Sequence, residues 1–219
     1  MKNIQIINII ALFLLLFGAS CHKDQPNANL VNLPKIVDTK CIFCDSIQNF
    51  SGTQIGNNWK YIVYDSLRRN VDTQTVVISG ETTLSDGRMS KIVKSYYSIS
   101  GDTTYTYLVE DASMATFYTT KEGSVFDKSY VYPLKIGTMW KGWHMLDTLR
   151  VDSKESIIVP AGNFSAYTIH KYYRVTNTFI LDDEWYCPGI GMIQRNYREL
   201  NFGPVMNKTF RLISYNFVK

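Results

Sequence analysis

Residues 57–69, NNWKYIVYDSLRR, and residues 73–84, TQTVVISGETTL, decide the fold of this chain. Both stretches are rich in Thr, Val, Ile and Tyr, the residue types that favour β-strands. In the first stretch Trp59, Tyr61 and Val63 fall on one face, because successive side chains of a strand point to opposite sides of the sheet. We therefore expect two consecutive strands here, the first with large apolar side chains gathered on one face.

Turn signals follow the strand-like stretches and predict hairpins between them. They stand at residues 85–87 (Ser-Asp-Gly), 100–102 (Ser-Gly-Asp) and 122–123 (Glu-Gly). The second half of the chain has the same strand-like composition, which gives roughly ten strands in all. Tight turns join antiparallel neighbours, whereas parallel strands need long crossovers. We predict an all-β fold: a single curved antiparallel sheet, as a half-barrel or a barrel-like meander.

Length and composition limit the class of protein further. At 219 residues the chain suits one domain with a substantial core. The formal net charge of +4 is small and the charges are scattered, so we expect no nucleic-acid partner. No stretch has the pattern of an amphipathic helix of normal length.

The N-terminal residues have the pattern of an export signal. Lys2 precedes an apolar run, residues 4–17, and the small residues 18–20 stand before Cys21. This run is shorter than the roughly 20 apolar residues of a transmembrane helix. The pattern resembles the lipobox of bacterial lipoproteins, whose cysteine becomes the lipidated first residue, although Gly18 stands where Leu is usual. The resemblance implies that Cys21 is the lipid attachment site, with acyl chains such as palmitate.

These features divide the chain into three parts. We expect a lipoprotein signal peptide at residues 1–20 and the antiparallel β domain at residues 41–219. Residues 21–40 are polar, contain two prolines and show no sustained period, so we expect a flexible tether. The expected location is outside the cytoplasm, lipid-anchored to the cell envelope at the outer membrane, where the lipid on Cys21 supplies the membrane contact.

Three further cysteines permit several interpretations. Cys41 and Cys44 form a C-x-x-C pair, and Cys187 stands late in the chain. A redox pair needs a strand before it and a helix after it, but the residues after Cys44 are turn-rich. Structural zinc needs four ligands, and the histidines form no paired motif. We expect a disulfide, either within the C-x-x-C loop or from one of its members to Cys187, and the pairing stays open.

Three segments of the second half carry a family resemblance. They are YPLKIGTMW (132–140), VPAGNF (159–164) and WYCPGIGMI (185–193). Motifs of the forms YPLxxGxxW, VPAGxF and PGIG recur in this order in a family of uncharacterised exported lipoproteins of Bacteroidetes-type bacteria. The chain resembles that family, which is similar in architecture to the LolA/LolB half-barrels that carry lipoproteins. The resemblance implies a curved sheet and names no activity.

The sequence contains no catalytic or metal-binding motif. Residues 182–184, Asp-Asp-Glu, lack the loop spacing of a calcium site, and we expect them in a solvated hairpin turn. No G-x-S-x-G elbow marks a serine nucleophile. His170 is an even number of positions from Phe164 and Ala166, so in a strand the three side chains share one face. We therefore expect His170 to be partly buried and not a catalytic base. We expect no enzyme activity, no metal and no other cofactor.

Aromatic side chains are the remaining candidates for a ligand site. Trp59, Tyr61, Tyr97, Trp140 and Trp185 combine apolar rings with polar tips and could face a ligand in a cavity. The same residues could instead fill the core through cross-strand pairing.

Two functions are compatible with these expectations. In the first, the membrane-anchored lipoprotein binds a lipid-like or hydrophobic small molecule in its curved sheet, which is a hypothesis from fold-level analogy. In the second, it is a structural or interaction module that binds an envelope protein or glycan through its surface and has no ligand cavity.

Overall fold

The computed structural model describes five segments, all within one compact unit, Pro34–Lys219: residues 52–123, 126–142, 147–175, 178–200 and 206–218. The expected signal peptide and tether, with Cys21, Cys41 and Cys44, lie outside the described residues. So do the domain boundaries expected after residues 20 and 40.

Twelve β-strands make up the described part of the chain, two more than the sequence indicates. In chain order they are β1 (Asn58–Asp65), β2 (Asn70–Thr83), β3 (Met89–Tyr97), β4 (Thr103–Glu110), β5 (Met114–Tyr118), β6 (Phe126–Val131), β7 (Met139–Lys141), β8 (Thr148–Val159), β9 (Gly162–Val175), β10 (Thr178–Cys187), β11 (Gly191–Leu200) and β12 (Met206–Asn216). Among the described residues there is no helix long and apolar enough to cross a membrane.

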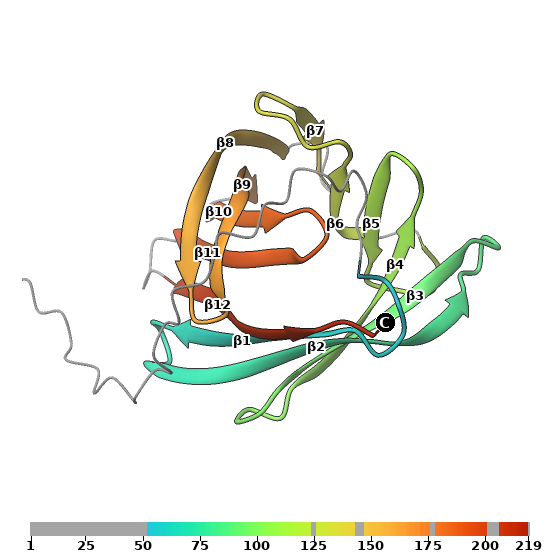
Figure 1. Ribbon diagram of the computed structural model, residues 1–219, viewed down its shortest axis with the longest axis horizontal. Helices are drawn as coiled ribbons and strands as arrows, with labels where there is room; N and C mark the ends of the chain where they lie inside the picture. Colours follow the sequence, from blue (N-terminus) through green and yellow to red (C-terminus); the bar gives the residue numbers. More distant parts are fainter. Residues whose placement is uncertain (1–51, 124–125, 143–146, 176–177, 201–205, 219) are drawn as a thin grey trace, which may run out of the picture. The chain divides into compact units, whose positions relative to one another are not determined.

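All twelve strands belong to one antiparallel sheet, which curls until it is nearly closed into a barrel (Figure 1). The strand order is β6-β5-β4-β3-β2-β1-β12-β11-β10-β9-β8-β7. Every pair of neighbours in this order is consecutive in the chain except β1 and β12. The sheet therefore consists of two meanders, β1 to β6 and β7 to β12, and the predicted curved antiparallel sheet is confirmed.

The two meanders are joined along β1 and β12. Asn58 lies opposite Asn216, and Asp65 lies opposite Lys208. Beyond the strands, the backbone N–H of Val218 donates to the side-chain oxygen of Asn57 at 2.6 Å. The first and last strands are thus neighbours, and the sheet opens between β6 and β7, which follow each other in sequence.

A side chain bridges the opening between β6 and β7. In the sheet that the structure describes, no ladder of backbone hydrogen bonds joins these two edge strands. The indole N–H of Trp140 on β7 donates to the backbone carbonyl of Ser129 on β6 at 3.0 Å. This contact holds the two edges near each other without closing the sheet.

The concave face of the sheet carries the core. On β1, Trp59, Tyr61 and Val63 are buried while Lys60 and Tyr64 are exposed, as the alternation predicts. Large side chains that are completely buried come from both meanders: Ile78, Leu108, Phe164, Tyr186, Ile193 and Leu212.

The acidic residues 182–184 lie in the middle of β10, so the hairpin turn expected there is wrong. Along this strand Ile180, Asp182, Glu184 and Tyr186 are buried and alternate with half-buried neighbours. Carboxylates are rarely buried unless they are paired. Here Arg195 on the adjoining strand β11 pairs with Asp182, and Lys128 on β6 pairs with Glu184 across the interior.

The segments that carry the family resemblance connect strands. Residues 132–138 link β6 to β7, residues 160–161 turn between β8 and β9, and residues 188–190 turn between β10 and β11. Gly162 and Gly189 have φ of 141° and 86°, which a side chain would strain. Both glycines therefore lie at tight turns between antiparallel strands.

Cys187 ends β10 and is completely buried. It is disulfide-bonded, and the other cysteines of the chain lie outside the described residues.

Candidate ligand-binding site

The interior of the curved sheet contains two adjoining cavities. One, of about 230 Å³, lies mainly against β1 to β4. The other, of about 220 Å³, lies mainly against β9 to β11. Lys128, Tyr130 and Arg195 line both cavities, which therefore meet along these side chains. We call them the apolar cavity and the charged cavity, after their linings.

The apolar cavity gathers three of the five predicted aromatics, Trp59, Tyr61 and Tyr97. Seven further lining side chains are apolar: Val76, Ile78, Val93, Leu108, Phe117, Met192 and Phe210. The neutral polar side chains in the lining are Gln74, Ser95, Thr104 and Thr106. Such a surface suits an apolar ligand that needs a few hydrogen-bonding groups for orientation.

Two of these aromatics are held by hydrogen bonds at their polar tips. The indole N–H of Trp59 donates to the carbonyl of Ile190 at 2.6 Å, and the Tyr61 hydroxyl donates to the carbonyl of Met192 at 3.0 Å. Burial, and then the charge of Glu184, raise the pKa of Tyr61 above its ordinary range, so its hydroxyl stays protonated. The ring positions are therefore fixed by contacts between β1 and the start of β11.

The other two predicted aromatics lie outside the linings of both cavities. Trp140 is the half-buried residue that bridges β7 to β6. Trp185 on β10 is half-buried against the core, between the buried Glu184 and Tyr186, and its indole N–H donates to the exposed Glu155. The structure thus brings together Trp59, Tyr61 and Tyr97 and separates Trp185 from them.

In the charged cavity, Arg195 and Asp182 form a bidentate ion pair. Arg195 Nε donates to Asp182 Oδ1 at 2.8 Å, and Nη2 donates to Oδ2 at 2.7 Å. Burial alone would raise the pKa of Asp182, but the charge and hydrogen bonds of Arg195 outweigh it and hold the pKa below its ordinary value. Lys171 and Lys128 act in the same direction. Asp182 is therefore ionised at neutral pH.

Glu184 takes part in a second cluster that reaches across the interior to β6. Lys128 Nζ lies 3.8 Å from Glu184 Oε2, and the Tyr130 hydroxyl donates to the same carboxylate. The ammonium also lies 5.2 Å from the ring centroid of Phe117 and 5.3 Å from that of Tyr130. Burial, and then the charge of Glu184, raise the pKa of Tyr130 well above its ordinary range, so it acts as a donor.

A third interior pair joins Lys171 on β9 to Asp147, with Lys171 Nζ 3.3 Å from Asp147 Oδ2. Asp147 is completely buried. Gly142 packs directly against this carboxylate, because a Cβ at that position would stand 2.3 Å from Asp147 Oδ2. The close approach leaves room for no side chain there.

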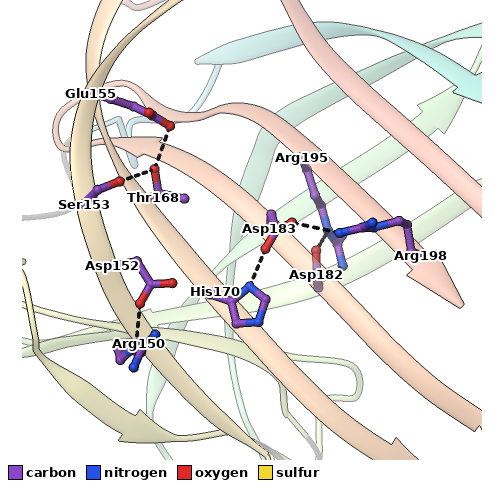
Figure 2. A network of polar contacts seen from close by, with 10 residues as sticks. All are labelled: Arg150, Asp152, Ser153, Glu155, Thr168, His170, Asp182, Asp183, Arg195 and Arg198. Atoms are coloured by element: carbon purple, nitrogen blue, oxygen red, sulfur yellow. Dashed lines mark hydrogen bonds and ion pairs between the residues drawn. The ribbon is translucent and has the colours of Figure 1, made fainter.

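The outer face of the same strands carries a separate polar network (Figure 2). His170 Nδ1 pairs with Asp183, and Arg198 Nη2 lies 3.5 Å from the same carboxylate. His170 is half-buried and pairs with Asp183, its cross-strand neighbour on β10. The partly buried side chain expected at this position is confirmed.

The charged half of the site was not predicted from the sequence. One pattern could have revealed it. Every second residue from Ile180 to Tyr186 is buried, and this period of two is typical of a strand with an inward face and not of a loop. In the described ranges, no group of three or more His, Cys, Asp or Glu residues could hold a metal ion. The arrangement suits binding of a molecule with an apolar and a polar part.

Comparison with known proteins gives two similar structures. One is a candidate lipoprotein from Parabacteroides distasonis, with a TM-score of 0.49 and 13% identity over 81% of this chain and 100% of the other. The second is a candidate exported protein with a YmcC-like fold from Bacteroides fragilis, with a TM-score of 0.49 and 10% identity over 77% of this chain and 99% of the other. No family model matches the chain, and no curated protein matches it. Likeness at this level assigns neither a family nor an activity.

Proposed function

We propose that this protein is an exported lipoprotein of the bacterial cell envelope whose sheet interior binds a lipid-like or hydrophobic ligand. The proposal has two parts: an anchor at Cys21 and a binding site in the two cavities. Binding, and not catalysis, is the proposed activity.

The anchor is supported by the sequence around Cys21. A positive residue, an apolar run and three small residues precede this cysteine, and a polar segment follows it. Several acyl chains give stable membrane attachment, because each buried methylene contributes about 0.8 kcal/mol. The proposed anchor leaves the β domain outside the bilayer and the membrane contact to the lipid.

The single observation that carries the binding proposal is the pair of adjoining cavities. Ligand sites commonly have volumes of about 300–1,000 Å³. Each cavity alone is smaller, at about 230 and 220 Å³, but the two cavities that share Lys128, Tyr130 and Arg195 in their linings together fall within this range. A core filled only for stability would leave few voids larger than a water molecule.

Native mass spectrometry of the protein purified from the membrane fraction, with extraction and analysis of lipids, tests the proposal. We expect a stoichiometric hydrophobic species that co-purifies with the chain. A bare mass for the β domain would contradict ligand binding and would favour a module that acts through its outer surface on an envelope protein or glycan. A mature mass without acyl chains would contradict the anchor alone.

A pair of variants locates the ligand. Thr106 lines the apolar cavity from β4, whereas Thr103 on the same strand is exposed and lines neither cavity. Thr106→Trp should fill the cavity and abolish co-purification of the ligand. Thr103→Trp is the matched control and should retain the ligand. Equal ligand content in both variants would place the ligand elsewhere.

A further inference from the structure

The cations of the interior ion pairs are more exposed than their carboxylates, and Asp182 and Glu184 line the charged cavity beside them. The side-chain exposures are 29% for Arg195 against 10% for Asp182, 26% for Lys128 against 10% for Glu184, and 15% for Lys171 against 0% for Asp147. In each of the three pairs the carboxylate is the more buried member. The charged cavity is therefore lined by three cations and by two carboxylates that are less exposed than the cations.

These three basic side chains share one compartment. Lys128 comes from β6, Lys171 from β9 and Arg195 from β11, and all three line the charged cavity. Lys128 and Arg195 also line the apolar cavity. A molecule with its apolar part among Trp59, Tyr61 and their neighbours would thus place its other end against basic groups.

We propose that the ligand of this site is a single-chain amphiphile with an anionic head group, a carboxylate or a phosphate. The head group is held by Lys128, Lys171 and Arg195, and the apolar chain occupies the apolar cavity. This inference rests on the proposed function and adds the charge and the orientation of the ligand. The modest size of the two cavities favours one chain over two.

Lys128 is the side chain best placed to contact such a head group. Its ammonium is 3.8 Å from the nearest Glu184 oxygen, longer than the roughly 2.7–2.9 Å of a charge-assisted hydrogen bond. A bound anion can therefore gain a hydrogen bond from Lys128 without breaking one to Glu184. The paired carboxylates keep the cavity near neutrality when no ligand is bound, which lowers the cost of burying these charges.

Displacement of a fluorescent fatty acid from the full chain tests the inference. The competitors are dodecanoate, dodecyl phosphate, dodecanol and dodecyltrimethylammonium, which share a chain and differ in head group. We expect at least one of the two anions to bind roughly tenfold or more tightly than the alcohol, because hydrogen bonds to charged groups are strong. The cationic amphiphile should bind most weakly. The preference between the two anions distinguishes a carboxylate ligand from a phosphate ligand.

Matched variants assign the selectivity to the cavity. Lys128→Met and Lys171→Met should each reduce affinity for the anions several-fold and leave affinity for dodecanol unchanged. Lys60→Met removes the same charge from the exposed face of β1 and should change neither. Lys171→Arg keeps the charge and should retain anion binding. This variant keeps the role of the charge testable if Lys171→Met fails to fold.

Two results would contradict the inference, and they have different consequences for the proposed function. Equal affinity for dodecanol and for both anions in the unmodified protein would refute an anionic head group while leaving a hydrophobic ligand in place. Failure of every amphiphile to displace the probe, or failure of the probe to bind, would refute the proposed function and this inference together.

Discussion

At the scale of single residues, the Arg195–Asp182 pair is the interaction whose loss should cost most. Arg195→Met would leave the buried Asp182 without its bidentate partner. Removing one member of a buried pair typically costs about 3–5 kcal/mol, and we expect about 3 kcal/mol of unfolding free energy by urea denaturation at neutral pH. Arg198→Met on the outer face of β11 is the control, and its half-exposed side chain predicts a loss below about 1 kcal/mol.

The same pair predicts a pH dependence. Arg195 holds the folded pKa of Asp182 below the unfolded value of about 3.9, so its stabilisation is present above that value and is lost as pH falls through the folded pKa. In Arg195→Met, burial dominates and raises that pKa, so the variant gains relative stability in acid. The difference in unfolding free energy between the two proteins should begin to shrink as pH falls through the raised pKa of Asp182 in the variant, above about 3.9, and should shrink further down to the lowered pKa in the unmodified protein. A difference independent of pH would contradict the ion pair.

Gly142 permits a second prediction at this scale. An added Cβ would stand 2.3 Å from Asp147 Oδ2 and 2.6 Å from its Cγ, and Asp147 is completely buried. Gly142→Ala should therefore destabilise the fold by about 1–3 kcal/mol, the usual cost of overpacking. Gly80→Ala is the control, because its Cβ would meet the nearest atom, on Ile92, at 3.7 Å. Equal thermal shifts for both variants would contradict the packing argument.

At the scale of elements, the opening between β6 and β7 should be the least protected part of the sheet. Edge strands lack one ladder of hydrogen bonds, and these two are connected to each other by the Trp140 indole. Trp140→Phe should cost about 1 kcal/mol, the net value of one hydrogen bond, and should speed amide exchange in β6 and β7 with little effect on β1 and β12.

Trp185→Phe provides the control for that measurement. Its indole N–H donates to Glu155, whose exposed carboxylate can bind water instead. We expect little change in exchange for β6 and β7 in this variant. If Trp140→Phe altered β1 and β12 as much as β6 and β7, the indole would be acting through global stability and not as a local bridge.

Local patterns predicted the elements better than they predicted the site. Trp59, Tyr61 and Val63 alternate on one strand, and the turns at residues 85–87 depend only on their own residues, so both could be identified from sequence. The charged cavity depends on register: Lys171 lies opposite Asp182 on neighbouring strands. Lys128 comes from the other meander. The residues around it in the sequence do not predict that it lies near Lys171 and Asp182.

At the scale of the whole molecule, the strand order predicts a circular permutation. Gly52 lies beside Phe217, since a Cβ on Gly52 would be 3.7 Å from that ring. A chain that begins at Ile136, joins residue 218 to residue 52 by a short linker and ends at Lys135 would run through the strands in their spatial order. Lys135 and Ile136 are exposed, which is where permutation is tolerated.

We expect this permuted chain to have the far-UV circular dichroism and two-state urea unfolding of residues 52–218 in their native order, the control, which likewise lacks the disulfide of Cys187. Amphiphile binding should also be retained, because no strand pair is removed. Folding of the control without folding of the permuted chain would mean that the β6–β7 connection is required for the sheet to form.

The β1–β12 pair also has a consequence for how quickly the protein folds. Among the described strands it is the one pair of neighbours that is distant in sequence, since it joins residues near 58 to residues near 216. Hairpin contacts form with a small loss of chain entropy, whereas distant contacts are slow to form. Each meander can therefore form by adding one strand after another. The rate of folding should be set by the pairing of β1 with β12.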